Sequence, residues 1–202
     1  MATKRQSPRE TLLVVCRANL IRSPIAAGLL RRHLTDAGLA HVRVRSAGVQ
    51  PGSDAVSIED VARIAEERGV DLTHHRPAAV TAELAARASI VLTMTEGQRA
   101  RVTRLEPGVT PRTFTLVELV RLTSTPDFAP APTCDDLARR AHLLRPLVAP
   151  APAPEDVPDP LGKGRRYLQA VVDDLGRLCE QVAALVAASP PVTTDPSAPT
   201  GP

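Results

Sequence analysis

The sequence feature that most constrains the fold is the uninterrupted apolar run TLLVVC at residues 11–16. A strand that is buried on only one face alternates apolar and polar residues, whereas a continuous β-branched run is typical of a strand buried on both faces. Such strands belong to parallel sheets with helices on both sides. The run SIVLTM at residues 89–94 has the same character. These two runs predict an α/β protein.

Segments with helical spacing alternate with these strands. After Pro24, the segment IAAGLLRRHL has helical spacing, and HVRVRS at residues 41–46 alternates as expected of a strand nearer the sheet edge. This alternation predicts a doubly wound parallel sheet with right-handed crossovers, flanked by helices. Further helices are expected at 57–68, 81–88, 116–122, 134–147 and 168–188, and one more with Thr95 as its N-cap. A short strand is expected at 113–115.

Proline marks the less regular part of the chain. Of the 20 prolines, 14 lie between residues 125 and 202. We therefore expect one domain over residues 11–188, interrupted by a Pro/Ala-rich insertion at 124–155. The polar segments 1–10 and 189–202 are expected to be disordered tails.

Composition argues against several classes of protein. The net charge is +3, but there is no basic run and only three residues are aromatic, so base stacking on nucleic acid is not expected. The three cysteines form no CxxC pair and show no metal-ligand spacing, which indicates a reducing compartment. No apolar run is long enough for a signal peptide or a membrane span. We expect a cytoplasmic monomer without metal or cofactor, which binds neither nucleic acid nor membrane.

The segment VVCRANLIRSPIAAGLL carries the chemistry. It places Cys16 at a strand end and Arg22 six residues later, where a helix begins. Backbone amides of such a loop and the helix N-terminus form an anion site, and their field favours a thiolate. The Arg22 guanidinium matches two phosphoryl oxygens. The residues expected around the phosphate are Arg17, Ala18, Asn19, Leu20, Ile21 and Ser23, with Asn19 holding the loop and Ser23 donating to the thiolate.

A thiolate that attacks a phosphate monoester also requires a proton for the departing oxygen. The segment EDVPDPLGKGRRY supplies Asp159 as the candidate acid. Pro160 holds the residue before it in an extended conformation, which suits a carboxylate presented from a loop. Asp156 is the substitute candidate.

These segments resemble the low-molecular-weight protein tyrosine phosphatase family. VCRANLIRSP resembles the family's loop pattern V-C-x-G-N-x-C-R-S-P. The segments RSAG, SIVLTMT and VPDP then follow in the order that the family shows. The resemblance covers residues 11–122 and 156–188.

The resemblance implies a metal-independent phosphatase with a phosphocysteine intermediate. It implies Cys16 as the nucleophile, Arg22 as the phosphate binder and Asp159 as the acid and base. It also implies a four-stranded parallel sheet with the order 2-1-3-4. Ala18 stands where the family usually has glycine. Ile21 replaces the family's second loop cysteine, so the protective disulfide within the loop cannot form.

The resemblance leaves the substrate open between several classes. Phosphotyrosine in proteins is the main prediction, because related arginine phosphatases carry threonine at the position of the bulky Leu20. Tyrosine-specific members have an aromatic pocket wall, whereas here only Gln50 and Tyr167 are rim candidates. A protein arginine phosphatase and a phosphatase of small molecules are the alternatives on the same fold. A thiol-dependent arsenate reductase and a non-catalytic phosphate-binding module also remain.

The other reactive side chains are expected to be structural. Cys134 and Cys179 fall on predicted helices and are expected to pack in the core. His74 and His75 are adjacent, but no further ligand lies at metal-binding spacing. A surface or sheet-edge role is therefore expected for both histidines.

Overall fold

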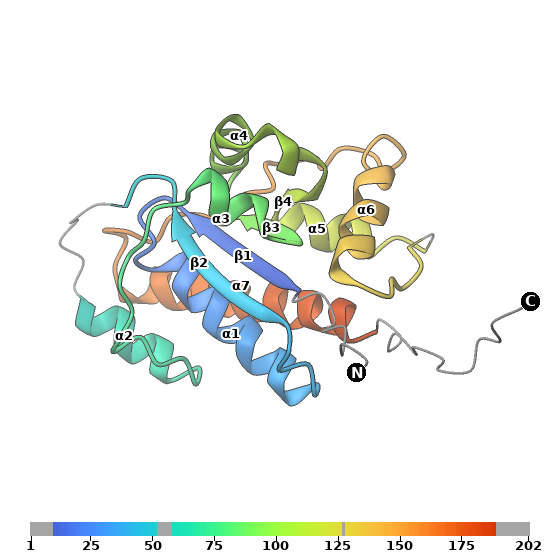
Figure 1. Cartoon of the computed structure of the whole chain (residues 1–202). Helices are drawn as coiled ribbons and strands as arrows, with labels where there is room; N and C mark the ends of the chain where they lie inside the picture. The colour runs from blue at the N-terminus through green and yellow to red at the C-terminus, as the bar shows by residue number, and fades with distance from the viewer. Residues whose placement is uncertain (1–9, 52–57, 127, 189–202) are drawn as a thin grey trace, which may run out of the picture.

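The computed structural model describes residues 10–51, 58–126 and 128–188, and it contains one four-stranded sheet (Figure 1). All strand pairs are parallel and the order is β2-β1-β3-β4, which confirms the predicted topology. The strands are β1 (Thr11–Cys16), β2 (Arg43–Gly48), β3 (Ile90–Thr93) and β4 (Thr113–Thr115).

Helices cover both faces of the sheet. Figure 1 shows α1 and α7 along one face and α3 and α4 on the other, as a doubly wound fold requires. None of the helices in the described ranges is long and apolar enough to cross a membrane. The helices are α1 (Arg22–Asp36), α2 (Ile58–Glu66), α3 (Ala82–Ala86), α4 (Glu96–Leu105), the 3₁₀ helix η1 (Pro107–Arg112), α5 (Leu116–Thr123), α6 (Cys134–Leu144) and α7 (Arg165–Ala187).

Strand β1 is buried on both faces because its neighbours in the sheet and both helical layers cover it. Leu12 and Val14 belong to the larger hydrophobic cluster, which includes α1 and α7. Leu13 and Val15 point the other way, into a smaller cluster with α3 and α4. Burying such a side chain contributes about 1.5–3 kcal/mol each, so the run TLLVVC fixes the centre of the sheet.

Several element ends differ from the sequence predictions. Strand β2 lies at 43–48 rather than 41–46, because Arg43 pairs with Thr11 and Gly48 with Cys16. Helix α6 ends at Leu144 rather than at Leu147, since Pro146 has no N–H to continue the helical hydrogen bonds. Helix α7 begins three residues before the predicted start, directly after Gly164 with φ +82°.

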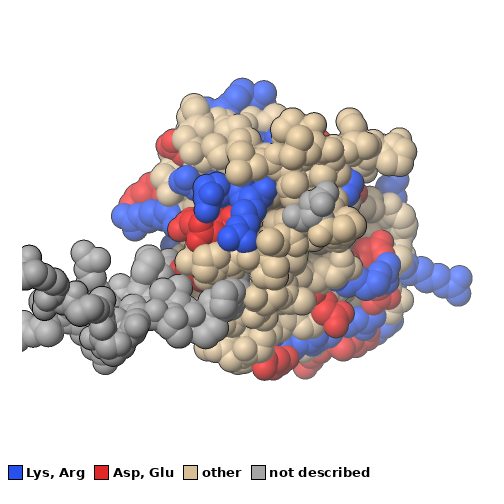
Figure 2. Space-filling view, turned by 90° about the vertical axis from the view of Figure 1, so that its right-hand side faces the viewer, with Lys and Arg blue, Asp and Glu red and all other residues tan. Residues whose placement is uncertain are grey.

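One part of the insertion, the start of α6, packs at the end of the sheet that lies away from Cys16. Glu10, expected in the disordered leader, is instead ordered: its carbonyl accepts from Arg43 N (2.9 Å) and its carboxylate from Cys134 N (2.7 Å). The start of α6 therefore lies beside the first residue of β1. Figure 2, viewed from the side of α6, shows a surface on which uncharged residues prevail. The predicted tails at 1–9 and 189–202 lie outside the described residues.

Candidate active site

The loop after β1 lies at the carboxyl edge of the sheet and leads directly into α1. Cys16 ends the strand and Arg22 is the first residue of the helix. Ile21, at the N-cap position, provides no side-chain acceptor for the first amides of the helix. Open amides at a helix N-terminus attract an anion, so the loop has the geometry of a phosphate cradle.

Asn19 fastens this loop. Its φ is +58°, a left-handed conformation that asparagine tolerates better than most residues. Its side chain donates to Ser23 Oγ (2.9 Å) and accepts from the amide of Ala78 (2.9 Å). Among the described residues Asn19 alone combines a side chain with positive φ. Ala18, which stands at the family's glycine position, therefore needs no positive φ.

Two donors point at the sulfur of Cys16. The amide of Asn19 lies 3.2 Å from Sγ, and the Ser23 hydroxyl lies 2.9 Å from it. The same hydroxyl accepts from the Asn19 side chain. Cys16 is only 2% exposed, yet its sulfur lines the pocket. One donor comes from the loop and the other from the first turn of α1, so both elements position the sulfur.

Arg22 joins the loop to the segment that contains the candidate acid. Its guanidinium donates to Asp159 Oδ2 (2.5 Å) and to the carbonyl oxygen of Val157 (3.1 Å). The Arg22 side chain is 4% exposed, whereas that of Asp159 is 41% exposed. The carboxylate thus faces the open side of the pocket while the cation is held inside.

The segment before Asp159 is fixed residue by residue. Glu155 forms an ion pair with Arg121 (2.5 Å), and Val157 N donates to Met94 O (2.7 Å). Asp156, the substitute acid, accepts from the amide of Glu96 (2.8 Å) at the start of α4. The Asp156 carboxylate is therefore engaged at α4 and does not line the pocket, whereas Asp159 does.

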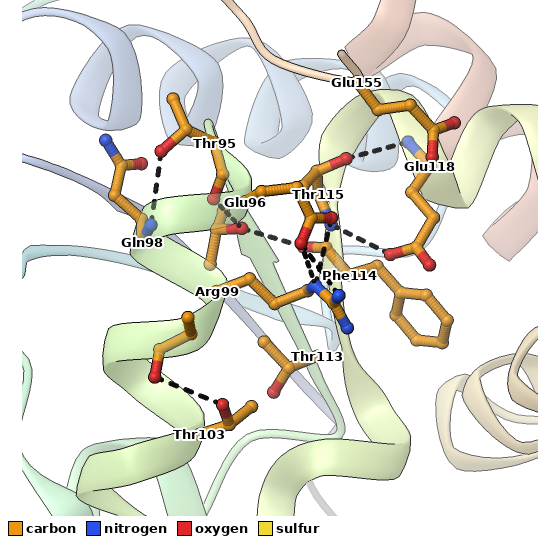
Figure 3. A network of polar contacts seen from close by, with 12 residues as sticks. Thr95, Glu96, Gln98, Arg99, Thr103, Thr113, Phe114, Thr115, Glu118 and Glu155 are labelled. Atoms are coloured by element: carbon orange, nitrogen blue, oxygen red, sulfur yellow. Dashed lines mark hydrogen bonds and ion pairs between the residues drawn. The ribbon is translucent and has the colours of Figure 1, made fainter. Parts of the chain in front are cut away.

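Threonine caps fix the helices that follow β3 and β4 (Figure 3). Thr95 Oγ1 accepts from the amide of Gln98 (3.2 Å) at the start of α4, as the sequence predicted. Thr115 and Glu118 form a reciprocal capping box on α5. These caps hold α4 and α5 at the same edge of the sheet as Cys16.

The pocket has a polar and an apolar lining. The polar lining consists of the three candidate catalytic residues and Arg17. Its apolar walls are Ala18, Leu20, Ile21 and Leu161. The remaining loop residues Asn19 and Ser23 are buried below it.

The two rim candidates do not line this pocket. Gln50 lines a neighbouring groove, and Tyr167 lies in the first turn of α7, 40% exposed. Leu161 occupies the rim instead, and the sequence reading missed it. Its amide lies 3.3 Å from Asp159 Oδ1, so the carboxylate and the wall belong to one turn. The sequence signal that points to Leu161 is its position two residues after Asp159.

His75 also supports the loop. Its Nε2 donates to the carbonyl oxygen of Asn19 (2.7 Å). The surface or sheet-edge role predicted for His75 is therefore incomplete.

Gly48 lies against the loop, and a Cβ at this position would come within 2.6 Å of Arg17 O. The glycine of RSAG is thus required by the close approach of the loop.

The other two cysteines lie away from the pocket. Burial raises the pKa of the Cys134 thiol, with a further contribution from Glu10, and burial alone raises the pKa of Cys179. Cys134 starts α6 beside Glu10, and the Cys179 sulfur contacts Ala26 O inside the α1–α7 packing. Both belong to the hydrophobic core, as expected for packing residues.

A parallel doubly wound sheet with a cysteine, an anion-binding loop, an arginine and a carboxylate at its carboxyl edge defines the class of cysteine-dependent phosphatases. The sequence model of the family described as "Low molecular weight phosphotyrosine protein phosphatase" matches residues 11–127. The chain belongs to this family.

Named relatives agree with this assignment. The chain is 33% identical over 110 residues to the probable low molecular weight protein-tyrosine-phosphatase EpsP of Ralstonia nicotianae, covering 54% of this chain and 72% of the relative. It is 33% identical over 117 residues to Etp of Escherichia coli K12, covering 58% and 76%. The solved structure of YwlE arginine phosphatase from Geobacillus stearothermophilus superposes with a TM-score of 0.61 at 26% identity, covering 87% and 91%.

Proposed function

We propose that this protein hydrolyses phosphate monoesters, with phosphotyrosine in proteins as the main substrate, through a phosphocysteine intermediate. The observation that carries the proposal is the position of the Cys16 sulfur. It accepts hydrogen bonds from Asn19 N and Ser23 Oγ and shares one pocket with the Arg22–Asp159 pair. This arrangement supplies a nucleophile, an anion clamp and an acid.

In the first step the Cys16 thiolate attacks phosphorus, and the bond between phosphorus and the ester oxygen breaks. Asp159, in its protonated form, gives its proton to the leaving oxygen. Arg22 and the loop amides stabilise the charge that develops on the phosphoryl oxygens. In the second step water attacks phosphorus and Asp159 takes its proton. The S–P bond then breaks, which releases phosphate and restores the thiolate.

The contact between Arg22 and Asp159 suggests how the acid is prepared. Without substrate, the Arg22 guanidinium is bound to Asp159 Oδ2 at 2.5 Å. A phosphate dianion in the pocket competes for the same guanidinium. Substrate binding therefore frees the carboxyl group of Asp159 from Arg22 to act on the leaving oxygen.

The apolar walls support an aromatic leaving group. Leu20, Ile21 and Leu161 line the pocket and offer apolar contacts to the flat face of a phenyl ring. Phosphoarginine is the second candidate, because a named protein-arginine-phosphatase of Geobacillus stearothermophilus is 32% identical over 109 residues. Small phosphorylated molecules complete the set to be tested.

The proposal extends to the working form of the protein. Each residue of the site comes from one chain, so a monomer suffices. Thiolate chemistry requires Cys16 to stay reduced, and we therefore place the protein in the cytoplasm. Binding of nucleic acid or membrane has no part in this mechanism.

Hydrolysis of p-nitrophenyl phosphate without added metal tests the acid. Replacing Asp159 by asparagine should lower kcat by about 10²–10⁴-fold, because the leaving oxygen loses its proton donor. The matched variant Asp156→Asn changes a carboxylate that lies on the same segment but does not line the pocket. This variant should lower kcat by less than about tenfold. An equal loss in both variants would contradict the assignment of Asp159. Absence of wild-type turnover between about pH 5 and 8 would contradict the phosphatase itself.

Two peptides of one sequence, carrying phosphotyrosine or phosphoarginine at the same position, separate the substrate classes. The proposal expects the higher kcat/KM for phosphotyrosine. A higher value for phosphoarginine would reassign the substrate and leave the mechanism in place.

A further inference from the structure

A groove lined by arginine lies beside the phosphate pocket. Arg17 lines both, so the groove opens where the substrate enters. Arg101 and Arg104 of α4 also line the groove, and no carboxylate is among its lining residues. Gln98 and Thr95, seen in Figure 3 at the start of α4, border the groove as well.

These three arginines differ from the arginines that form ion pairs. Within the described ranges, no acidic side chain pairs with Arg17, Arg101 or Arg104, whereas ten other arginines form ion pairs. The contrast holds even within α4, where Arg99 is bound to Glu96. The cations of the groove are exposed and available to an acidic ligand.

Their spacing suits an extended peptide. Gly97, Arg101 and Arg104 are related as i, i+4 and i+7, so they share one face of α4. They span about 10 Å along the helix axis, which is the length of about three residues of extended chain. Gly97 contributes no side chain, and a Cβ there would meet only Thr95 Oγ1, at 3.9 Å. A polypeptide that leaves the pocket can therefore lie along this face.

We propose that the groove binds an acidic segment of the substrate protein, within about three or four residues of the phosphorylated side chain. The inference rests on the proposed phosphatase function and adds the chemical character of the substrate. Asp and Glu side chains pair with arginine in good geometry. A nucleic acid is a poorer occupant, because no aromatic side chain lines the groove for base stacking.

Charge reversal tests this inference. Three peptides carry the phosphorylated residue that the wild type hydrolyses, flanked on both sides by glutamate, glutamine or lysine. The wild type should show about three- to tenfold higher kcat/KM for the glutamate peptide than for the glutamine peptide, and salt should reduce this difference. The double variant Arg101→Glu and Arg104→Glu should instead prefer the lysine peptide. Damage to the fold cannot produce such a gain.

The control changes the same charge elsewhere. Arg43 and Arg45 are exposed on the edge strand β2, opposite Thr11 and Leu13. Reversing both should leave the preference for the glutamate peptide intact. Turnover of p-nitrophenyl phosphate, which fills only the phosphate pocket, should be the same in all three proteins.

The outcomes separate this inference from the proposed function. A wild type that hydrolyses p-nitrophenyl phosphate without preferring the glutamate peptide overturns the inference alone. The same holds if the preference survives in the double variant, or if that variant loses affinity only for a single-stranded oligonucleotide. A wild type without any turnover overturns the proposed function first, and the inference with it.

Discussion

Replacing Cys16 by serine is expected to reduce kcat for p-nitrophenyl phosphate by about 10⁴-fold or more. A hydroxyl is far less acidic than a thiol, and the two donors at 2.9 and 3.2 Å from the sulfur cannot produce an alkoxide at neutral pH. Serine is close in size to cysteine, so the fold should persist. Steady-state kinetics measure the loss, and thermal unfolding checks that the folded state remains.

The matched control for this variant is Cys134→Ser. That thiol lies at the start of α6, at the end of β1 opposite Cys16, so activity should change little. The Cys16 variant should also still bind a phosphorylated peptide, because Arg22 and the loop remain. Substantial turnover by the Cys16 variant would contradict thiolate catalysis.

Replacing Arg22 by lysine is expected to lower kcat/KM by about 10³-fold, although the charge is kept. The guanidinium uses two nitrogens at once, for Asp159 Oδ2 and Val157 O. An ammonium group is a point charge and cannot reproduce a planar fork on a phosphoryl group. Kinetics on p-nitrophenyl phosphate measure the effect.

The result separates geometry from charge at this position. A loss of less than about tenfold in Arg22→Lys would show that charge alone is sufficient and would contradict the bidentate clamp. Because Arg22 also contacts Val157, thermal unfolding of the variant should be measured beside kinetics. The variant Arg22→Ala, which also removes the charge, should lose more kcat/KM than Arg22→Lys.

The part of the fold that the sequence predicts well is the part with a local signal. TLLVVC and SIVLTM are apolar on both faces, and that pattern is compatible only with central strands between two helical layers. The order of residues from Cys16 to Arg22 likewise places a loop between a strand end and a helix start. Thr95 caps its helix as expected, since capping is decided within four residues.

Of the two missed residues, His75 depends on a contact between distant segments and Leu161 on a local turn. His75 supports the loop through a carbonyl 56 positions earlier, and nothing near His75 in the sequence announces it. Leu161 became a wall because the turn after Asp159 folds back on the carboxylate. The family resemblance implies a pocket rim at Gln50 and Tyr167, but Gln50 lines the neighbouring groove and Tyr167 lies in α7.

Local sequence patterns also do not predict the role of the insertion. Residues 124–155 show only proline-rich loops and one helix in the sequence. In the structure Arg145 lies 4.2 Å from the centroid of the Phe114 ring and pairs with Glu118, while Glu155 pairs with Arg121. The insertion is therefore fastened to β4 and α5, and its last residue leads directly into the segment that presents Asp159.

The central claim is that phosphate passes through Cys16. Its most direct test is a rapid acid quench of the first turnover of p-nitrophenyl phosphate by the wild type, followed by mass spectrometry of the peptide that contains residues 11–22. The account predicts a burst of p-nitrophenol when hydrolysis of the intermediate limits the rate, with phosphate attached to the sulfur of Cys16. Product formation with phosphate on another side chain, or with none on the protein during the burst, would contradict it.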